Sequence, residues 1–331
     1  MKQFKLLNRI LGFMVFAIAM ATYGLTIEPT ASFWDCPEFI STAAKLEVGH
    51  PPGAPFFMLT GKFVSLFASD PTQIAYCVNM LSAFFSALTI LFLYFTITHL
   101  ARRMLVEKDQ EFALWKVITC LGSGVIGALA YTFSDTFWFS AVEAEVYAYS
   151  SFLTAIVFWL ILKWEEHADQ PQSDKYLILI TYLMGLSIGV HLLNLLTIPA
   201  IVLVYYYRKY QQTSVKGMLI ALLVSFAILG FILYGLVPGF INLAGYVELL
   251  FVNTLGLPFN SGALFYCFAT VSVLIWSLIE LYKNQPNDLR IKISSLLAVS
   301  LLGIPFVMGS WWIGLLVIAL IIVYFVRCKD L

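Results

Sequence analysis

The sequence predicts an all-α protein that crosses a membrane several times. Hydrophobic residues make up 61% of the 331-residue chain and charged residues only 11%, whereas charged residues are roughly a quarter of an average soluble domain. A soluble fold could not bury this much apolar surface. Because the bilayer core offers no water to backbone groups, the segments inside it must satisfy those groups themselves, as helices do. Long apolar runs along the chain match the length of a spanning helix.

Ten such runs predict a bundle of about ten transmembrane helices, since roughly 17 to 25 apolar residues cross the hydrocarbon core. In chain order they are 8–27, 74–99, 115–133, 149–163, 176–190, 192–207, 217–237, 261–281, 293–308 and 311–326. No long polar segment separates them. We therefore interpret residues 1–331 as a single membrane domain without a soluble domain.

The positions of the basic residues predict which way the helices run. Lysines and arginines accumulate in the cytoplasmic loops of membrane proteins. With the N-terminus in the cytoplasm, only Lys45 and Lys62 of the 19 basic residues fall on the opposite side. The long outer segments are then 28–73, 134–148 and 238–260.

Several classes of function lack their usual sequence features. The five cysteines form no CxxC or Cys/His zinc pattern. The sequence has no glycine-rich phosphate loop and no HExxH motif. The formal net charge is 0 and no basic stripe is present, so nucleic acid is not an expected partner.

The first outer segment contains a sequence pattern that predicts a short helix between two apolar runs. Its sequence, SFWDCPEFISTAAKLEVGHPPGAPFF, covers residues 32–57. Proline suits the first turn of a helix, and a helix from Pro37 to about Glu47 would place Phe39, Ala43 and Leu46 on one face. Such a stripe is typical of a helix lying in the membrane interface. The following run, 54–68, is too short to cross and is predicted to be interfacial or re-entrant.

The start of this helix determines what Asp35 can do. If Pro37 is the first helical residue, Cys36 is the N-cap and the carboxylate of Asp35 stays free. The alternative is that Asp35 caps the helix and Glu38 closes a capping box. Both carboxylates lie beside Trp34 and other aromatic residues, and loss of hydration raises the pKa of an acid and marks it as a functional candidate.

Other polar residues of the outer face are weaker candidates. Glu143 and Glu145 are two residues apart, which places them on opposite sides of a strand or helix, so that one could face a site and the other water. A solvated pair is the alternative. For His50 the alternative is an ordinary loop histidine. His191 and Asn194 interrupt the apolar stretch 176–207; they mark either a functional site at membrane depth or a turn between two helices.

Three segments together resemble a known family. They are FWDCPEFISTAAKLEVGHPPGAPFF, SDTFWFSAVEAEVYA and GLSIGVHLLN, and they are similar to the protein O-mannosyltransferase-like membrane family called domain of unknown function 2723, which belongs to the GT-C glycosyltransferases. The resemblance covers most of residues 8–210. It implies a GT-C-like catalytic core there, whereas 211–331 contributes further transmembrane helices.

The resemblance also implies an activity. Such enzymes move a sugar, mannose in the O-mannosyltransferases, from a polyprenyl-phosphate donor to a Ser or Thr hydroxyl of a protein on the non-cytoplasmic face, with inversion. Asp35 matches the family's catalytic Asp and would act as the general base, with Glu38 as the nearest second acid. The expected partners are the sugar lipid, an acceptor protein and the bilayer. The resemblance favours a bacterial inner membrane with the active site on the periplasmic side.

The donor phosphate needs cations or N–H donors. The outer face has no arginine, so the candidates are Lys45, Lys62, His50 and His191. The predicted substrate-binding set also includes Trp34, Glu143, Glu145 and Asn194. A divalent metal held by Asp35 with Glu143 or Glu145 is an alternative, but O-mannosyltransferases are regarded as not needing one, and we predict no metal site and no cofactor besides the donor.

Two other functions fit the same pattern. The acceptor could be a lipid or glycan instead of a protein. The protein could also be a transporter or flippase of polyprenyl-linked substrates, which would predict inverted repeats and charged residues at mid-membrane depth. The sequence shows no such repeat, and its acids fall in the outer loops.

Overall fold

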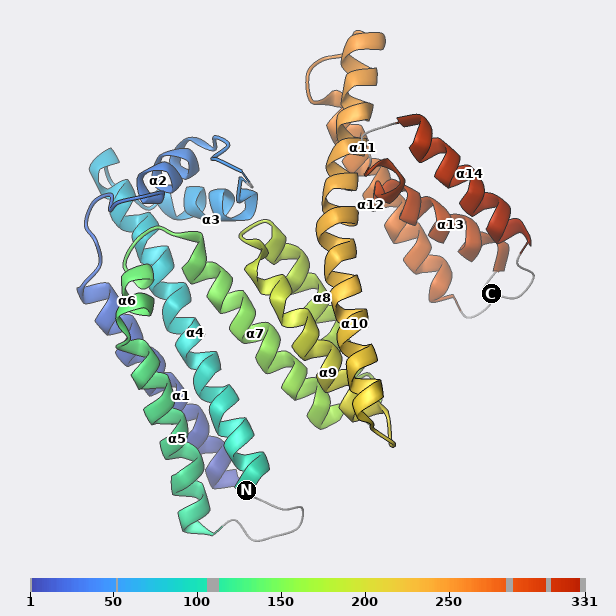
Figure 1. Cartoon of the computed structure of the whole chain (residues 1–331). Coiled ribbons are helices and arrows are strands. Elements are labelled where there is room, and N and C mark those ends of the chain that lie inside the picture. The colour runs from blue at the N-terminus through green and yellow to red at the C-terminus, as the bar shows by residue number, and fades with distance from the viewer. Residues whose placement is uncertain (1, 52, 106–112, 284–287, 308–310, 328–331) are drawn as a thin grey trace. The chain divides into compact units, whose positions relative to one another are not determined.

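The computed structural model describes residues 2–51, 53–105, 113–283, 288–307 and 311–327 (Figure 1). These residues contain helices and connecting segments and no β-strand, which confirms the all-α prediction. They fall into two compact units, Met1–Leu222 and Leu223–Leu331, and each is described by itself.

The first unit contains long helices and a set of short ones that cover one end. Its elements are α1 (Lys2–Leu25), α2 (Cys36–Lys45), α3 (Pro55–Ser65), η1 (Pro71–Gln73), α4 (Ile74–Leu105), α5 (Leu114–Thr132), α6 (Asp135–Ala141), α7 (Val146–His167), α8 (Asp174–Ile188), η2 (Leu192–Thr197), α9 (Ile198–Lys209) and the start of α10 (Val215–Phe231).

The second unit continues the helical chain. Its elements are the rest of α10, η3 (Ile232–Leu236), α11 (Val237–Leu249), η4 (Leu250–Thr254), α12 (Ser261–Leu281), α13 (Asp288–Leu301), η5 (Ile304–Phe306) and α14 (Trp311–Arg327). Within this unit α12 packs against α11 and α13.

Helix α4 is the centre of the first unit, because α1, α5 and α7 all pack against it. Small side chains on α4, such as Ala83 and Ala87, are fully buried and let the neighbouring helices approach closely, as is typical of helix packing in membranes. Gly124 of α5 has the same effect, since a Cβ at this position would collide with Tyr94 and Thr98 of α4.

Among the residues that the structure describes, six helical segments are long and apolar enough to cross a membrane: 3–25, 71–105, 114–132, 146–167, 215–254 and 261–281. They coincide with six of the ten predicted spans. The other four correspond to α8, α9, α13 and α14, which have 15, 12, 14 and 17 residues. These are helical as predicted, and residue 308 of the run 293–308 lies outside the described residues. Whether the four cross the bilayer stays a prediction.

The predicted outer segment 238–260 is helical for most of its length, and on which side of the membrane it lies stays a prediction. The helical conformation continues from Val215 through Thr254, with π-helical turns at Ile232–Leu236 and Leu250–Thr254. Proline usually breaks a helix because it lacks an N–H group and collides with the preceding turn. Here Pro238 is the second residue of α11, which begins where the π-helical turn Ile232–Leu236 ends, and the helix continues past it.

Asn79 connects α4 to the segment that leads into α2. It is fully buried, and its Nδ2 donates to the backbone carbonyls of Glu28 at 2.6 Å and Thr30 at 2.8 Å. The thiol of Cys36 donates weakly to its Oδ1 over 3.8 Å. A single side-chain amide therefore donates hydrogen bonds to two backbone carbonyls of an irregular segment, which have no partner within a helix.

We expect Asn79→Leu to lower the apparent Tm of the purified chain in detergent by several degrees, because two buried carbonyls lose their donors at a cost of roughly 2–3 kcal/mol. Differential scanning fluorimetry measures the shift. Ser86→Ala is the matched control on the same helix, since this fully buried hydroxyl has no hydrogen-bond partner among the described residues. Equal shifts in the two variants would contradict the role of Asn79.

Candidate functional site

Helices α2 and α3 lie together at one end of the first unit, against the start of α4 (Figure 1). Phe39 and Ala43 of α2 are buried in a cluster with Phe57 of α3. Gly61 allows the two helices to approach, because a Cβ there would lie 2.8 Å from the Cβ of Ala43. Leu46, predicted on the same face, is 52% exposed, since the helix ends at Lys45 and Leu46 turns into the left-handed region.

The structure corrects the predicted start of α2. The helix begins at Cys36 and its N-cap is Asp35, not Cys36. The carbonyl of Asp35 already accepts a helical hydrogen bond from the N–H of Phe39 at 2.9 Å, which places Pro37 one position later than predicted. The carboxylate of Asp35 nevertheless makes no capping hydrogen bond. The expectation of a free carboxylate is therefore correct although the cap residue was wrong.

Glu38 and His50 form a clamp between α2 and the loop that follows it. Glu38 Oε1 accepts from the backbone N–H of His50 at 2.6 Å, and Oε2 lies 3.1 Å from its Nδ1. These bonds with the backbone and ring of His50 lower the pKa of Glu38, and the bond with Glu38 raises the pKa of His50, assisted by the negative charges of Asp35 and Glu145. The capping box proposed as an alternative role for Glu38 is thus not formed.

The clamp turns His50 toward Asp35. With Nδ1 bonded to Glu38, Nε2 lies 3.9 Å from Asp35 Oδ2. The ligand atoms of Asp35, Glu38 and His50 all lie within 4.8 Å of one another. This carboxylate–histidine cluster could hold a divalent cation, but both oxygens of Glu38 already accept from His50, and a cation would have to displace the ring from one of them.

Glu143 and Glu145 are both buried, at 4% and 6% exposure, so the prediction that one faces water is wrong. They lie in the irregular connection between α6 and α7, whose middle residue, Ala144, packs in the same cluster as Cys36. Burial, together with the negative charges of Glu143 and Asp35, raises the pKa of Glu145 to about 7. Burial also raises the pKa of Glu143, partly offset by the hydroxyl of Ser32.

The remaining predicted residues lie around the cluster rather than in it. Lys62 donates to the carbonyl of Ala44 at 2.6 Å and so stabilises the C-terminus of α2. Lys45 is exposed in the last turn of the same helix. Trp34 is 87% exposed and has a φ of 62°, a left-handed conformation that is costly for a bulky residue.

His191 and Asn194 lie where α8 gives way to η2. The Nδ1 of His191 accepts from the N–H of Leu193 at 3.1 Å, and its ring packs against Tyr147. Asn194 is fully buried, and its Nδ2 has no partner among the described residues. This is the turn between two helices that the sequence left open as an alternative. None of the described contacts joins either residue to Asp35, Glu38, Glu143 or Glu145.

Sequence reasoning missed two polar residues that shape the site. Ser32 bonds Glu143, and Asn79 anchors the segment before Asp35. Asn79 had a signal, because an amide near the start of an apolar span needs a buried partner. Ser32 had none, since a serine in a polar loop is ordinary.

The fold and the cluster define a helical membrane protein with a carboxylate–histidine site at one end of its bundle. The chain belongs to the family described as protein O-mannosyl-transferase TMEM260 N-terminal domain, whose model matches residues 35–214, more than half of the chain. This confirms the resemblance seen in the sequence. The match begins at Asp35 itself.

Two curated relatives are similar to this chain. Protein O-mannosyl-transferase TMEM260 of Mus musculus is 26% identical over 175 residues, which are 53% of this chain and 22% of the relative. Protein O-mannosyl-transferase tmem260 of Dictyostelium discoideum is 24% identical over 197 residues, 57% of this chain and again 22% of the relative. The chain thus spans about a fifth of the length of these relatives. No solved structure is detectably similar.

We expect Glu145 to make stability depend on pH between about 5 and 8. Because its pKa is raised in the fold, the folded chain holds a proton that the unfolded chain releases, so the free energy of unfolding falls as pH rises through this window, by about 3 kcal/mol at most. The Tm of the wild type should fall relative to Glu145→Gln from pH 5 to pH 8. The exposed Glu47→Gln is the control. A constant difference between wild type and Glu145→Gln would contradict the assignment.

Proposed function

We propose that this chain is a glycosyltransferase that moves mannose from a polyprenyl-phosphate donor to Ser or Thr hydroxyls of proteins. The names of its relatives support protein O-mannosylation. The observation that carries the proposal is the carboxylate of Asp35, which is half-exposed and makes no capping hydrogen bond, with the ring of His50 3.9 Å away and held in place by Glu38.

Asp35 is the general base of the proposed reaction. The O–H bond of the acceptor breaks as its proton passes to the carboxylate, the oxygen bonds to C1 of the sugar, and the C1–O bond to phosphate breaks on the opposite face. The phosphate leaves with the electron pair, so the reaction inverts C1 and needs no carboxylate nucleophile.

The neighbours of Asp35 have supporting roles. Glu38 fixes the ring of His50, so that a protonated Nε2 can donate to the acceptor oxygen or the phosphate. Glu145, when protonated, adds no negative charge near the incoming phosphate. The exposed ring of Trp34, directly before Asp35, offers a flat apolar surface on which a sugar can stack.

No metal is required in this mechanism, because the raised pKa of His50 favours a cation at the place where a metal would otherwise sit. The phosphate meets positive charge there without a divalent ion.

We expect Asp35→Asn to lower transfer of labelled mannose from polyprenyl-phosphate mannose to a Ser/Thr peptide by roughly 10²- to 10⁴-fold, the usual value of a positioned base. Transfer should persist in EDTA. The control is Glu47→Gln, an exposed acid of the same outer segment.

Two results would contradict this proposal. If Asp35→Asn transfers mannose as fast as the wild type, Asp35 is not the general base. If EDTA abolishes transfer and Mg²⁺ or Mn²⁺ restores it, the enzyme depends on a metal. Transfer to extracted lipid with none to the peptide would replace the protein acceptor by a lipid one.

We also propose that the N-terminus is cytoplasmic and that Asp35 faces the opposite side. In support, the described basic residues Arg102, Arg103 and Lys163 gather at the far ends of α4 and α7 from Asp35. That this membrane is a bacterial inner membrane, with Asp35 on the periplasmic side, stays a prediction.

We expect a membrane-impermeant thiol reagent added to intact cells to label Lys45→Cys and to leave Lys209→Cys unlabelled, in a background without the native cysteines. The two positions lie at opposite ends of the first unit, so each is the other's control. Labelling of position 209 alone would reverse the orientation.

A further inference from the structure

A cavity lies in the first unit, at the opposite end from Asp35. Its volume is about 680 Å³. The start of α1 and the last turns of α4 and α7 line it, and both α1 and α7 pack on α4. The apolar part of its wall consists of the aromatic residues Phe4, Phe13, Phe95 and Trp159.

The charged residues of this cavity are unbalanced. Five cationic side chains line it and only one carboxylate, namely Lys5, Arg9, Arg102, Arg103 and Lys163 against Glu166. Such an excess of one sign in a concave, partly apolar site attracts an ion of the opposite sign.

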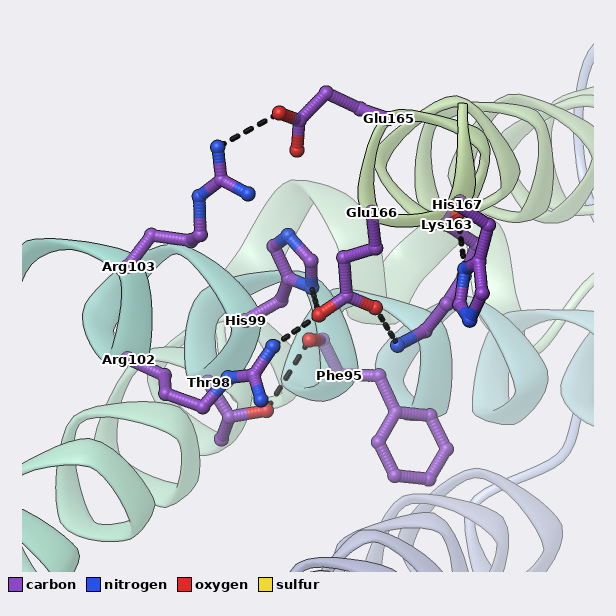
Figure 2. A network of polar contacts seen from close by, with 9 residues as sticks. All are labelled: Phe95, Thr98, His99, Arg102, Arg103, Lys163, Glu165, Glu166 and His167. Carbon is purple, nitrogen blue, oxygen red and sulfur yellow. Dashed lines mark hydrogen bonds and ion pairs between the residues drawn. The ribbon is translucent and has the colours of Figure 1, made fainter. Parts of the chain in front are cut away.

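The single carboxylate is already fully engaged, as Figure 2 shows. Glu166 pairs with Arg102 and, at 2.7 Å, with Lys163, and it lies 3.6 Å from Nδ1 of His99. Arg103 pairs with Glu165 at 2.7 Å. This network fixes the guanidinium of Arg102 at the cavity wall and leaves Glu166 no capacity to neutralise α1.

Lys5 and Arg9 have no hydrogen bond or ion pair within the part of the chain that the structure describes. They are exposed and one turn apart on α1, where like charges repel. An anion between α1 and the Glu166 network would relieve this repulsion and accept N–H donors from both sides.

We infer that this cavity binds the anionic headgroup of a bilayer glycerophospholipid. The phosphate accepts from Lys5, Arg9 and Arg102, because charge-assisted bonds of this kind are the strong ones. The acyl chains follow the exposed apolar side of α1, which carries Ile10 at 46% and Phe13 at 61% exposure. A membrane lipid suits this wall better than free phosphate, since α1 is long and apolar enough to span a bilayer.

The test uses the full chain, purified in a mild detergent, and counts bound lipids by native mass spectrometry. The probes are phosphatidylglycerol and phosphatidylcholine with identical acyl chains. We expect the wild type to retain phosphatidylglycerol preferentially. The double variant Lys5→Gln/Arg9→Gln should bind it roughly tenfold more weakly, since each cation near an anionic headgroup contributes a several-fold gain in affinity, while phosphatidylcholine binding stays unchanged.

The matched control is Lys175→Gln/Lys216→Gln, which removes two exposed cations of the same unit that do not line the cavity. It should bind phosphatidylglycerol as the wild type does. Neither double variant removes a described hydrogen bond, so both should fold, which their thermal unfolding checks.

Four outcomes would overturn the inference: no preference for phosphatidylglycerol, equal loss in both double variants, displacement of the lipid by millimolar inorganic phosphate, or selective retention of a polyprenyl phosphate. The first two outcomes would show that the cavity is not an anionic-lipid site, and the last two would show that it binds a different anion. None of them depends on whether the chain transfers mannose.

Discussion

The need to pair polar groups at both ends of α4 constrains the first unit more than any other feature. This helix has 32 residues and is therefore about 48 Å long, and α1, α5 and α7 pack around its apolar middle. Asn79 near its start holds the segment that leads to Asp35. His99 and Arg102 near its end meet Glu166 of α7. Buried polar groups are costly unless they are bonded, so these contacts fix both ends of the bundle.

At the Asp35 end, the carboxylates have different surroundings and therefore different pKa values. Glu38 is held ionised by two bonds from His50, whereas burial favours the protonated form of Glu145. The carboxylate of Asp35 makes no capping hydrogen bond and has His50 Nε2 at 3.9 Å. Pairs of acids whose surroundings push their pKa values apart are typical of sites for proton transfer. The geometry thus gives one carboxylate of the group the freedom that a base requires.

The sequence predicted the all-α class, the free carboxylate of Asp35 and the position of the first outer helix, because these depend on local composition and on Pro37. It did not predict that Glu143 and Glu145 are both buried, because their spacing sets directions only in a regular element and they lie in an irregular connection. The bond from Lys62 to Ala44 also escaped, since it joins two helices whose packing depends on Gly61.

At the end of the first unit that carries Arg102, some cations have carboxylate partners and others have none among the described residues. This difference distinguishes the cations that membrane topology and folding explain from those that a bound ligand would explain. The positive-inside tendency explains why cations gather at the end that carries Arg102 and Lys163, but it does not explain how they are paired. Glu165 and Glu166 pair with the cations of α4 and α7, as a fold requires for its own stability. Lys5 and Arg9 face the same cavity without such partners. A charge that contributes nothing to folding and still lines an apolar recess is most simply explained by a ligand, and in a bilayer the most abundant anion of matching shape is a phospholipid headgroup.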